Sequence, residues 1–98
     1  MPRDPFVWEV QVRREVLEQE VAKLRELPYG LWREMLSRQM TKSATGRDNR
    51  PYRVRVTAAW AHQGSEDIRV TAILQTPGLG RSLMRQGFVI TPENRLTE

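Results

Sequence analysis

Residues 52–61 read Tyr-Arg-Val-Arg-Val-Thr-Ala-Ala-Trp-Ala, so that apolar side chains recur at every second position. This period of two is typical of an antiparallel strand with one buried face and one face in water. Residues 68–75, Ile-Arg-Val-Thr-Ala-Ile-Leu-Gln, alternate in the same way. The apolar face of the two strands is predicted to carry Tyr52, Val54, Val56, Ala58, Trp60, Ile68, Val70, Ala72 and Leu74.

Turns and further strands flank this pair. Segments rich in Gly, Pro, Asn, Asp and Ser predict turns at 46–51, 62–67 and 76–80. A short strand is predicted at 40–45, before the first turn, and a last strand at 82–91, after the third. Gly87 would mark a bulge or a close-packing point in that last strand. The sequence therefore predicts a three- to four-stranded antiparallel meander.

Two helical segments precede the strands. Apolar residues recur at steps of three and four over residues 13–26, with charged residues facing away. Residues 27–30 read Leu-Pro-Tyr-Gly, and the proline ends the first helix because it disfavours helical geometry before it. A second apolar stripe predicts a shorter helix that ends near Gln39. The two stripes consist of Val16, Leu17, Val21 and Leu24, and of Leu31, Trp32, Met35, Leu36 and Met40.

The segment before residue 13 fits two structures. Phe6, Trp8 and Val10 alternate as they would in a strand, and the valines of this segment favour a strand as well. Asp4 and Pro5 instead form a good helix start, because aspartate caps a helix and proline suits its first position. We favour one long helix from about residue 5.

These elements predict one α+β domain, 1–98, with a helical part at 5–39 and a sheet part at 40–91. Two N-terminal helices packed on one face of the antiparallel meander would bury both helical stripes and the apolar face of the sheet together. A chain of 98 residues has the size of a single domain.

Composition excludes several classes of protein. The chain has no cysteine, so it holds no disulfide and no thiolate metal site. No stretch approaches the roughly 18 apolar residues of a membrane span, and no apolar run typical of a secretory signal follows the N-terminus. We therefore predict a cytoplasmic protein that acts without a membrane and without a cofactor.

Arginine dominates the positive charge. The formal net charge is +4, and residues 33–55 hold seven basic residues against two acidic ones, a net +5. A basic segment attracts phosphate, although an arginine-rich coding bias on a solvated surface gives the same pattern. The candidate ligands for an anion or a nucleic acid are Lys42, Arg47, Arg50, Arg53, Arg55 and Arg69.

Three of these candidates, Arg53, Arg55 and Arg69, lie on the polar face of two strands that should pair. Guanidinium groups suit phosphate oxygens. Sheet-surface RNA binders, however, also stack bases on exposed aromatic side chains, whereas Tyr52 and Trp60 are predicted on the apolar face. The pattern predicts weak nucleic-acid binding that does not depend on base sequence.

Catalytic motifs are missing from the sequence. His62 is the only histidine, and it lies with Glu66 and Asp67 in a segment whose polar composition a turn already explains. No serine lies in a Gly-x-Ser-x-Gly motif, and residues 77–82 lack the Gly-Lys-Ser/Thr of a phosphate-binding loop. We predict that the chain is not an enzyme, and a small enzyme centred on His62 is the least favoured function.

Several short motifs resemble those of a known group of proteins. They are Leu-Pro-Tyr at 27–29, Gly-x-Asp at 46–48, Tyr-x-Val-x-Val at 52–56, Asp-Ile-Arg-Val at 67–70 and Phe-Val-Ile-Thr-Pro at 88–92. Over residues 24–96 the chain is similar to a group of small bacterial proteins of unassigned function. The third turn of that group is rich in Asp and Gly, whereas here it contains Thr-Pro-Gly at 76–78. The resemblance implies the helix, Leu-Pro-Tyr, helix and meander fold, and it implies no activity and no functional residue.

The favoured function is that of an interaction module that binds a protein partner or a second copy of itself. Tryptophan is enriched at interfaces as well as in cores. Trp32 and Trp60 fit the core, and Trp8 lies in the ambiguous N-terminal segment. Either that apolar segment or an unpaired sheet edge would supply the contact. The candidate partner-binding residues are Phe6, Val7, Trp8 and Val10. The alternative is an accessory nucleic-acid binder that uses the Arg/Thr face.

Overall fold

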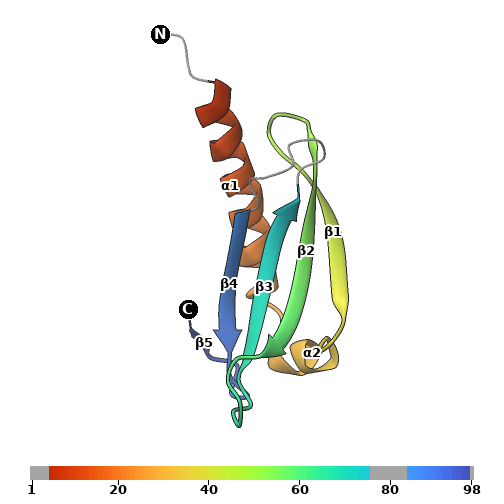
Figure 1. Cartoon of the computed structure of the whole chain (residues 1–98), viewed down its shortest axis with the longest axis vertical. Coiled ribbons are helices and arrows are strands. Elements are labelled where there is room, and N and C mark those ends of the chain that lie inside the picture. The colour runs from red at the N-terminus through yellow and green to blue at the C-terminus, as the bar shows by residue number, and fades with distance from the viewer. Residues whose placement is uncertain (1–4, 76–83, 98) are drawn as a thin grey trace.

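The fold is a five-stranded antiparallel sheet with a long helix against one face (Figure 1). The computed structural model describes residues 5–75 and 84–97, with side chains from residue 10 onward in those ranges. The elements are α1 (Pro5–Leu24), α2 (Tyr29–Glu34), β1 (Gln39–Thr45), β2 (Pro51–Trp60), β3 (Ile68–Gln75), β4 (Met84–Ile90) and β5 (Leu96–Thr97). Strands that follow one another in the chain are neighbours in the sheet. The predicted α+β class, with its helices at the N-terminus and its antiparallel sheet, is confirmed.

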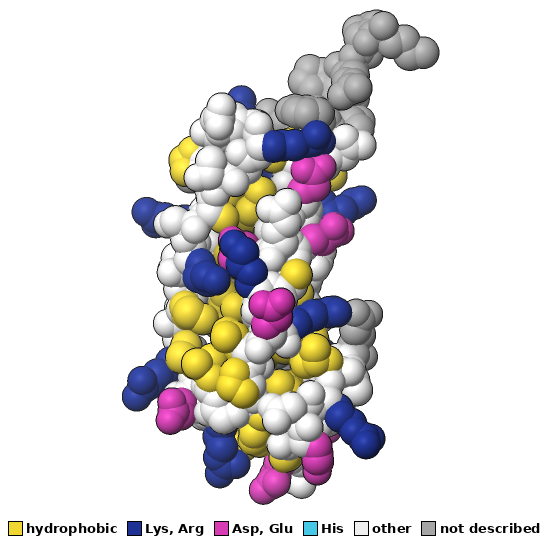
Figure 2. Space-filling view, turned by 180° about the vertical axis from the view of Figure 1, so that it is seen from behind, with side chains coloured by type: hydrophobic (Ala, Val, Ile, Leu, Met, Phe, Trp, Pro, Cys, Tyr) yellow, Lys and Arg dark blue, Asp and Glu magenta, His cyan; other side chains and the backbone are white. Residues whose placement is uncertain are grey.

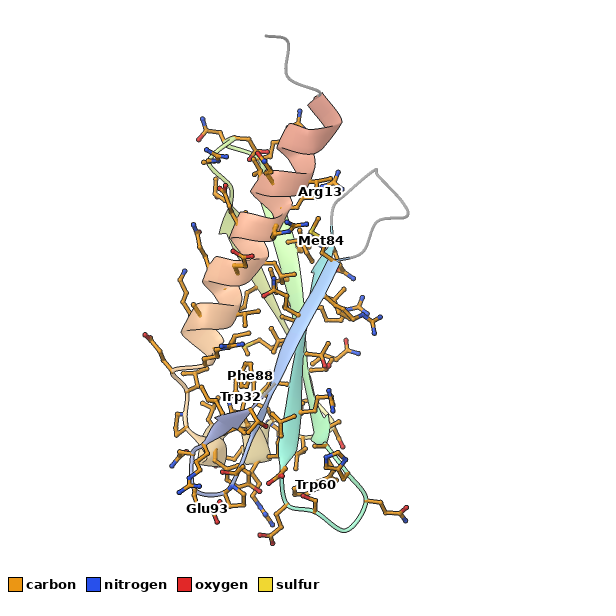
Figure 3. All side chains as sticks on the ribbon, turned by 90° about the vertical axis from the view of Figure 1, so that its left-hand side faces the viewer. Arg13, Trp32, Trp60, Met84, Phe88 and Glu93 are labelled. Atoms are coloured by element: carbon orange, nitrogen blue, oxygen red, sulfur yellow. The ribbon has the colours of Figure 1, made fainter. Side chains whose placement is uncertain are left out.

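The two faces of the sheet differ because side chains alternate along each strand. α1 lies behind the sheet in Figure 1 and packs mainly against β3 and β4. Seen from that helical side, Figure 2 shows mixed positive and negative side chains, with hydrophobic side chains gathered in the lower half. In Figure 3 the helix stands on one side of the sheet, and side chains that end in nitrogen project from the other side.

The second helix is shorter than the sequence predicts. α2 ends at Glu34 instead of near Gln39. Ser37 has a φ of 65°, which interrupts helical geometry, and Leu36 forms an isolated parallel bridge with β2. The chain thereby starts β1 at Gln39, so that Met40, which the helical stripe includes, belongs to a strand. The short strand that the sequence predicts before the first turn is confirmed.

The N-terminal segment is helical from Pro5, so the helical interpretation of residues 6–12 is confirmed and the strand interpretation is wrong. Asp4, the predicted cap, lies outside the described residues. The predicted turn at 76–80 lies outside them as well, as do the first two residues of the strand predicted at 82–91.

The sheet has five strands, where the sequence predicts three to four. After β4 the chain makes a turn in which the Thr91 N–H donates to the Arg95 carbonyl at 2.9 Å. Asn94 adopts a φ of 65° in this turn. The turn places Leu96 opposite Ile90, and this pairing forms β5. A strand of two residues is too short for an alternating pattern, which is why the sequence does not predict it.

One core fills the space between the helices and the sheet. Trp32 is fully buried, and its ring lies edge-on to Phe88 with 6.1 Å between ring centroids (Figure 3). The alternation along β2 predicts Trp60 in this core too, and that prediction is wrong, because its side chain is 47% exposed. Trp60 is the last residue of β2, and it lies beside α2, where the Arg33 guanidinium is 5.7 Å from its ring centroid.

Candidate functional site

Four arginines gather on the face of the sheet opposite α1, which we call the open face. Arg53 and Arg55 come from β2, Arg69 from β3 and Arg85 from β4. The strand register places them on one face. Along each strand they alternate with buried residues, which point to the helical side, so the arginines point to the opposite side. Arg55 is half-buried, and the other three side chains are exposed.

Arginines from different strands lie close together on the open face. Arg55 and Arg85 both lie opposite Ile73, one on each side of it. Two strand spacings of about 4.8 Å put their Cα atoms roughly 10 Å apart. Arg53 precedes Arg55 by two residues on the same strand, at about 7 Å. These separations let one bound anionic chain contact several guanidinium groups.

A row of short side chains crosses the open face between the arginines. Thr57, Thr71 and Gly87 lie opposite one another in this row, and Arg69 lies in the next row. Gly87 packs closely, as predicted, because a Cβ at this position would lie 2.6 Å from the Val70 carbonyl oxygen. The two threonine hydroxyls are therefore flanked by guanidinium groups, and hydroxyls can donate hydrogen bonds to an anion.

The described strands that form the open face carry no carboxylate. None of the strands β1 to β5 contains Asp or Glu. Within residues 10–75 and 84–97, none of the four arginines forms an ion pair. Arginine stays protonated throughout the physiological pH range. The open face therefore carries four positive charges, three of them on exposed side chains.

The other predicted anion ligands lie elsewhere. Lys42 is on the helical face of β1, where its Nζ lies 3.3 Å from Glu20 Oε2. Arg47 is in the turn between β1 and β2, with its Nε 2.9 Å from Glu15 Oε1. Arg50 is in the same turn. The structure thus places Arg53, Arg55 and Arg69 on one face of the sheet, and Lys42, Arg47 and Arg50 outside that face.

Arg85 is the residue of this face that sequence reasoning missed. The sequence does contain a pattern that places Arg85 on the open face. Met84, Gln86, Phe88 and Ile90 occupy every second position of β4 on the helical face, so Arg85 falls on the other face. The segment lacks the clear apolar alternation of β2, since Gly87 and Val89 share the face with Arg85. A register with β3 is needed to place Arg85 beside Ile73.

Aromatic side chains are missing from the open face of the described strands. Tyr52, Trp60 and Phe88 are the aromatic residues of these strands, and all three alternate with the arginine positions. Stacking on aromatic rings is how many sheet surfaces hold unpaired bases. The open face can therefore bind phosphate groups but offers no ring for base stacking.

The Gly-x-Asp motif and Tyr52 form a small hydrogen-bonded cluster at the β1–β2 turn. The Tyr52 hydroxyl donates to Asp48 Oδ2 at 2.7 Å, and the Arg50 N–H donates to Asp48 Oδ1 at 3.2 Å. A Cβ on Gly46 would lie 2.6 Å from Asp48 Oδ1 and 2.8 Å from the Tyr52 ring. The glycine therefore makes room for the hydrogen-bonded pair, and the motif stabilises the β1–β2 turn.

Burial and hydrogen bonding shift the pKa of both members of this pair. Burial raises the pKa of Tyr52 most, and the hydrogen bond to Asp48 and its negative charge raise it further, to about 12. Burial alone would raise the pKa of Asp48. The hydrogen bonds from Tyr52 and from backbone N–H groups, together with the charge of Arg50, outweigh burial and lower it. The pair is therefore a protonated phenol that donates to a carboxylate.

The Leu-Pro-Tyr motif contributes a second hydrogen-bonded cluster through Tyr29. The Tyr29 N–H donates to Asn94 Oδ1 at 2.8 Å, and the Tyr29 hydroxyl donates to the Glu66 carbonyl at 2.6 Å. Tyr29 itself is buried. It thereby ties the start of α2 to the turn after β2 and to the turn after β4. The Gly-x-Asp and Leu-Pro-Tyr motifs therefore have structural roles in this chain.

His62 lies exposed in the turn between β2 and β3. Among the described residues, no group of three or more His, Cys, Asp or Glu side chains is placed to hold a metal ion. A shallow pocket of about 220 Å³ lies between α1 and β4, lined by Glu18, Val21, Ala22, Arg25 and Gln86. Small-molecule sites commonly measure about 300 to 1,000 Å³ and are mostly apolar, so this pocket is small and polar by comparison.

The predicted partner-binding residues fall at the start of α1. Phe6, Val7 and Trp8 belong to the helix, and their side chains lie outside the described part of the structure. Val10 is half-buried. Their role in binding a partner stays a prediction. The edges of the sheet, the other predicted contact, are formed by β1 and by β5.

Comparison with protein-family models, curated proteins and solved structures finds no match for this chain. No helix in the described ranges has an apolar stretch long enough to cross a membrane. The similarity to small bacterial proteins stays a prediction from the motifs.

Proposed function

We propose that the chain binds the phosphate backbone of nucleic acid on its open face and does not read base sequence. The observation that supports this proposal is the set of four arginines on the open face, which form no ion pair within residues 10–75 and 84–97 and lie on strands without Asp or Glu. Each guanidinium can donate two parallel hydrogen bonds to one phosphate. The proposal assigns no catalytic role to the chain.

Backbone recognition is favoured over base recognition by the side chains of the open face. Thr57 and Thr71 can donate to phosphate oxygens, as hydroxyl groups commonly do in such complexes. The aromatic side chains of the strands belong to the other face, so single-stranded bases find no aromatic ring of these strands to stack on. A protein that neutralises four phosphates of duplex DNA should show a slope of about −3.6 for log affinity against log salt concentration.

The test is a titration of labelled duplex DNA and single-stranded RNA with the full chain. We expect the affinity for the duplex to fall about 100-fold between 50 and 200 mM salt. The double variant Arg55→Glu, Arg85→Glu should bind roughly tenfold more weakly or worse. The matched control is Arg14→Glu with Arg38→Glu, which makes the same change in net charge at two exposed arginines outside the strands.

The two double variants distinguish a site from a general charge effect. Loss of binding in the open-face variant alone supports the proposal. Equal loss in both variants means that only the net charge matters and contradicts a site on the open face. Affinity that does not change with salt also contradicts the proposal, because phosphate contacts release counterions.

A further inference from the structure

The two edges of the sheet differ in how they are covered. At one edge, β5 covers part of β4, because it pairs with Val89 and Ile90, the last two residues of that strand. At the other edge, β1 has no partner on its outer side among the described residues. Figure 1 shows β1 at one margin of the sheet, and β4 with the short β5 beside its end at the other margin. An uncovered strand of seven residues presents backbone groups that can pair with another strand.

The hydrogen bonds of the β1–β2 turn show which backbone groups of β1 point outward. The Gly46 N–H donates to the carbonyl of Arg50, directly opposite it. Pairs alternate along an antiparallel ladder, so the next pair, Thr45 and Pro51, does not exchange hydrogen bonds. Pro51, which has no N–H, fits that position. The outward-pointing N–H and C=O groups of β1 therefore belong to Gln39, Thr41, Ser43 and Thr45.

The edge strand carries little net charge to oppose pairing. Its open-face side chains are Gln39, Thr41, Ser43 and Thr45, none of them charged. Monomeric proteins commonly protect such edges with proline, a bulge or a free lysine. Here the single lysine, Lys42, lies 3.3 Å from the buried carboxylate of Glu20. The positive charge at this edge is therefore compensated within the same chain.

We infer that β1 pairs with β1 of a second copy of the chain, antiparallel, around a two-fold axis at Thr41. In this register Thr41 lies opposite Thr41 of the second copy, and Gln39 lies opposite Ser43. All of these residues point their N–H and C=O groups outward, so the groups meet across the axis. An interface of this kind is isologous and closes as a dimer.

The helical face of the edge favours this register over one centred at Lys42. With the axis at Thr41, Met40 lies opposite Lys42 of the second copy, whose aliphatic stem can cover the half-buried methionine. An axis at Lys42 would place two lysines directly opposite each other, which is unfavourable. Met35, Leu36 and Met40 are partly buried on this side, and hydrophobic side chains are visible in the lower half of this face (Figure 2).

The dimer joins two sheets into one and keeps both open faces on the same side, because the axis is perpendicular to the sheet. A contact one strand wide is small beside the roughly 1,200 to 2,000 Å² that stable complexes bury. We therefore expect a concentration-dependent dimer with a dissociation constant in about the micromolar range.

The test is sedimentation of the full chain, free of nucleic acid, over about 5 to 500 μM. The wild type should pass from monomer to dimer. Thr41→Pro removes an outward N–H without removing a bond to β2, and it should raise the dissociation constant at least tenfold. Thr41→Val is the matched control, which keeps the N–H and should stay within about twofold of wild type. A wild type that is monomeric throughout, or Thr41→Pro that dimerises as well as wild type, overturns the inference.

Amide hydrogen exchange of the wild type tests the proposed β1–β1 pairing even if Thr41→Pro does not fold. The Thr41 and Ser43 amides should exchange more slowly as the protein concentration rises, because the second copy accepts their hydrogen bonds. The Lys42 amide bonds to β2 and should be protected at every concentration. Exchange at Thr41 that does not change with concentration overturns the inference. Since no nucleic acid is present, neither measurement depends on the proposed function.

Discussion

The hydroxyl of Tyr52 makes stability depend on pH through a single residue. Its pKa of about 12 in the folded chain exceeds the value of roughly 10 for an unfolded tyrosine. A raised pKa means that the contribution to stability is complete below pH 10 and is lost as the pH rises towards 12. In urea unfolding, the wild type should lose stability over this window, and Tyr52→Phe should lose less. At neutral pH the variant should be roughly 1 to 2 kcal/mol less stable.

The Asp48→Asn variant separates the effect of charge from that of burial. Without the carboxylate, Tyr52 keeps its burial but loses the negative charge and the strong acceptor. The absorbance of its phenolate should therefore appear at lower pH than in wild type, with Tyr52→Phe used to assign the signal. An unchanged titration would show that Asp48 does not hold the proton on Tyr52. The pKa of Asp48 is lowered, so its carboxylate contributes stability that is lost as the pH falls below the ordinary pKa of an aspartate, which is 3.8.

The face of each residue could be predicted only where a strand has a long period of two. Arg53, Arg55 and Arg69 lie in such strands, and the structure places all three on one face. Lys42 lies in a strand where polar residues occupy both faces, so its direction follows from pairing with Val54 and not from the pattern. Arg47 joins Glu15 of a distant helix, a contact that no local pattern indicates. The candidate site was thus half predictable from the sequence.

At the level of elements, periodicity predicts the long strands and α1 but not the points where the chain changes direction. The end of α2 depends on Ser37, and the start of β5 depends on Asn94, both with φ near 65°. A single left-handed residue reverses the chain without altering the apolar spacing on either side. The predicted helical stripe therefore runs on into β1, and the periodicity does not predict the two-residue strand β5.

Asn94 is expected to hold two elements together. Its side-chain oxygen accepts the Tyr29 N–H at 2.8 Å, and its own backbone is left-handed. Asn94→Ala loses the acceptor and strains the backbone, so it should destabilise the fold by about 2 to 3 kcal/mol. Asn94→Gly tolerates the same φ but lacks the acceptor, and it should cost about 1 kcal/mol. Thermal or urea unfolding of the two variants measures the difference.

The two Asn94 variants separate the contribution of the hydrogen bond to Tyr29 from that of the left-handed backbone at Asn94. If Asn94→Gly is as stable as wild type, the hydrogen bond to Tyr29 contributes nothing, and the turn is set by conformation alone. If Asn94→Ala matches Asn94→Gly, the left-handed backbone carries no measurable strain. Either result would contradict the account of this turn.

Across the whole molecule, the two layers differ in charge. The strands of the open face carry four arginines and no Asp or Glu, whereas α1 on the other side carries residues of both signs, among them Glu18, Arg14 and Lys23. An anionic partner is therefore attracted more strongly to the open face than to the mixed charges of the helical side (Figure 2). The proposed dimer preserves this difference, because both copies present their open faces in the same direction.

This arrangement predicts that dimer formation changes the salt dependence of nucleic-acid binding. A monomer contacts about four phosphates of a duplex, which gives a slope near −3.6, whereas a dimer on one long duplex contacts up to twice as many. At protein concentrations where the wild type is dimeric, its slope should be steeper than that of Thr41→Pro and approach about −7. Thr41→Val should behave as wild type. Equal slopes for a dimeric wild type and a monomeric Thr41→Pro would mean that the two open faces do not act on the same duplex, even though each could still bind alone.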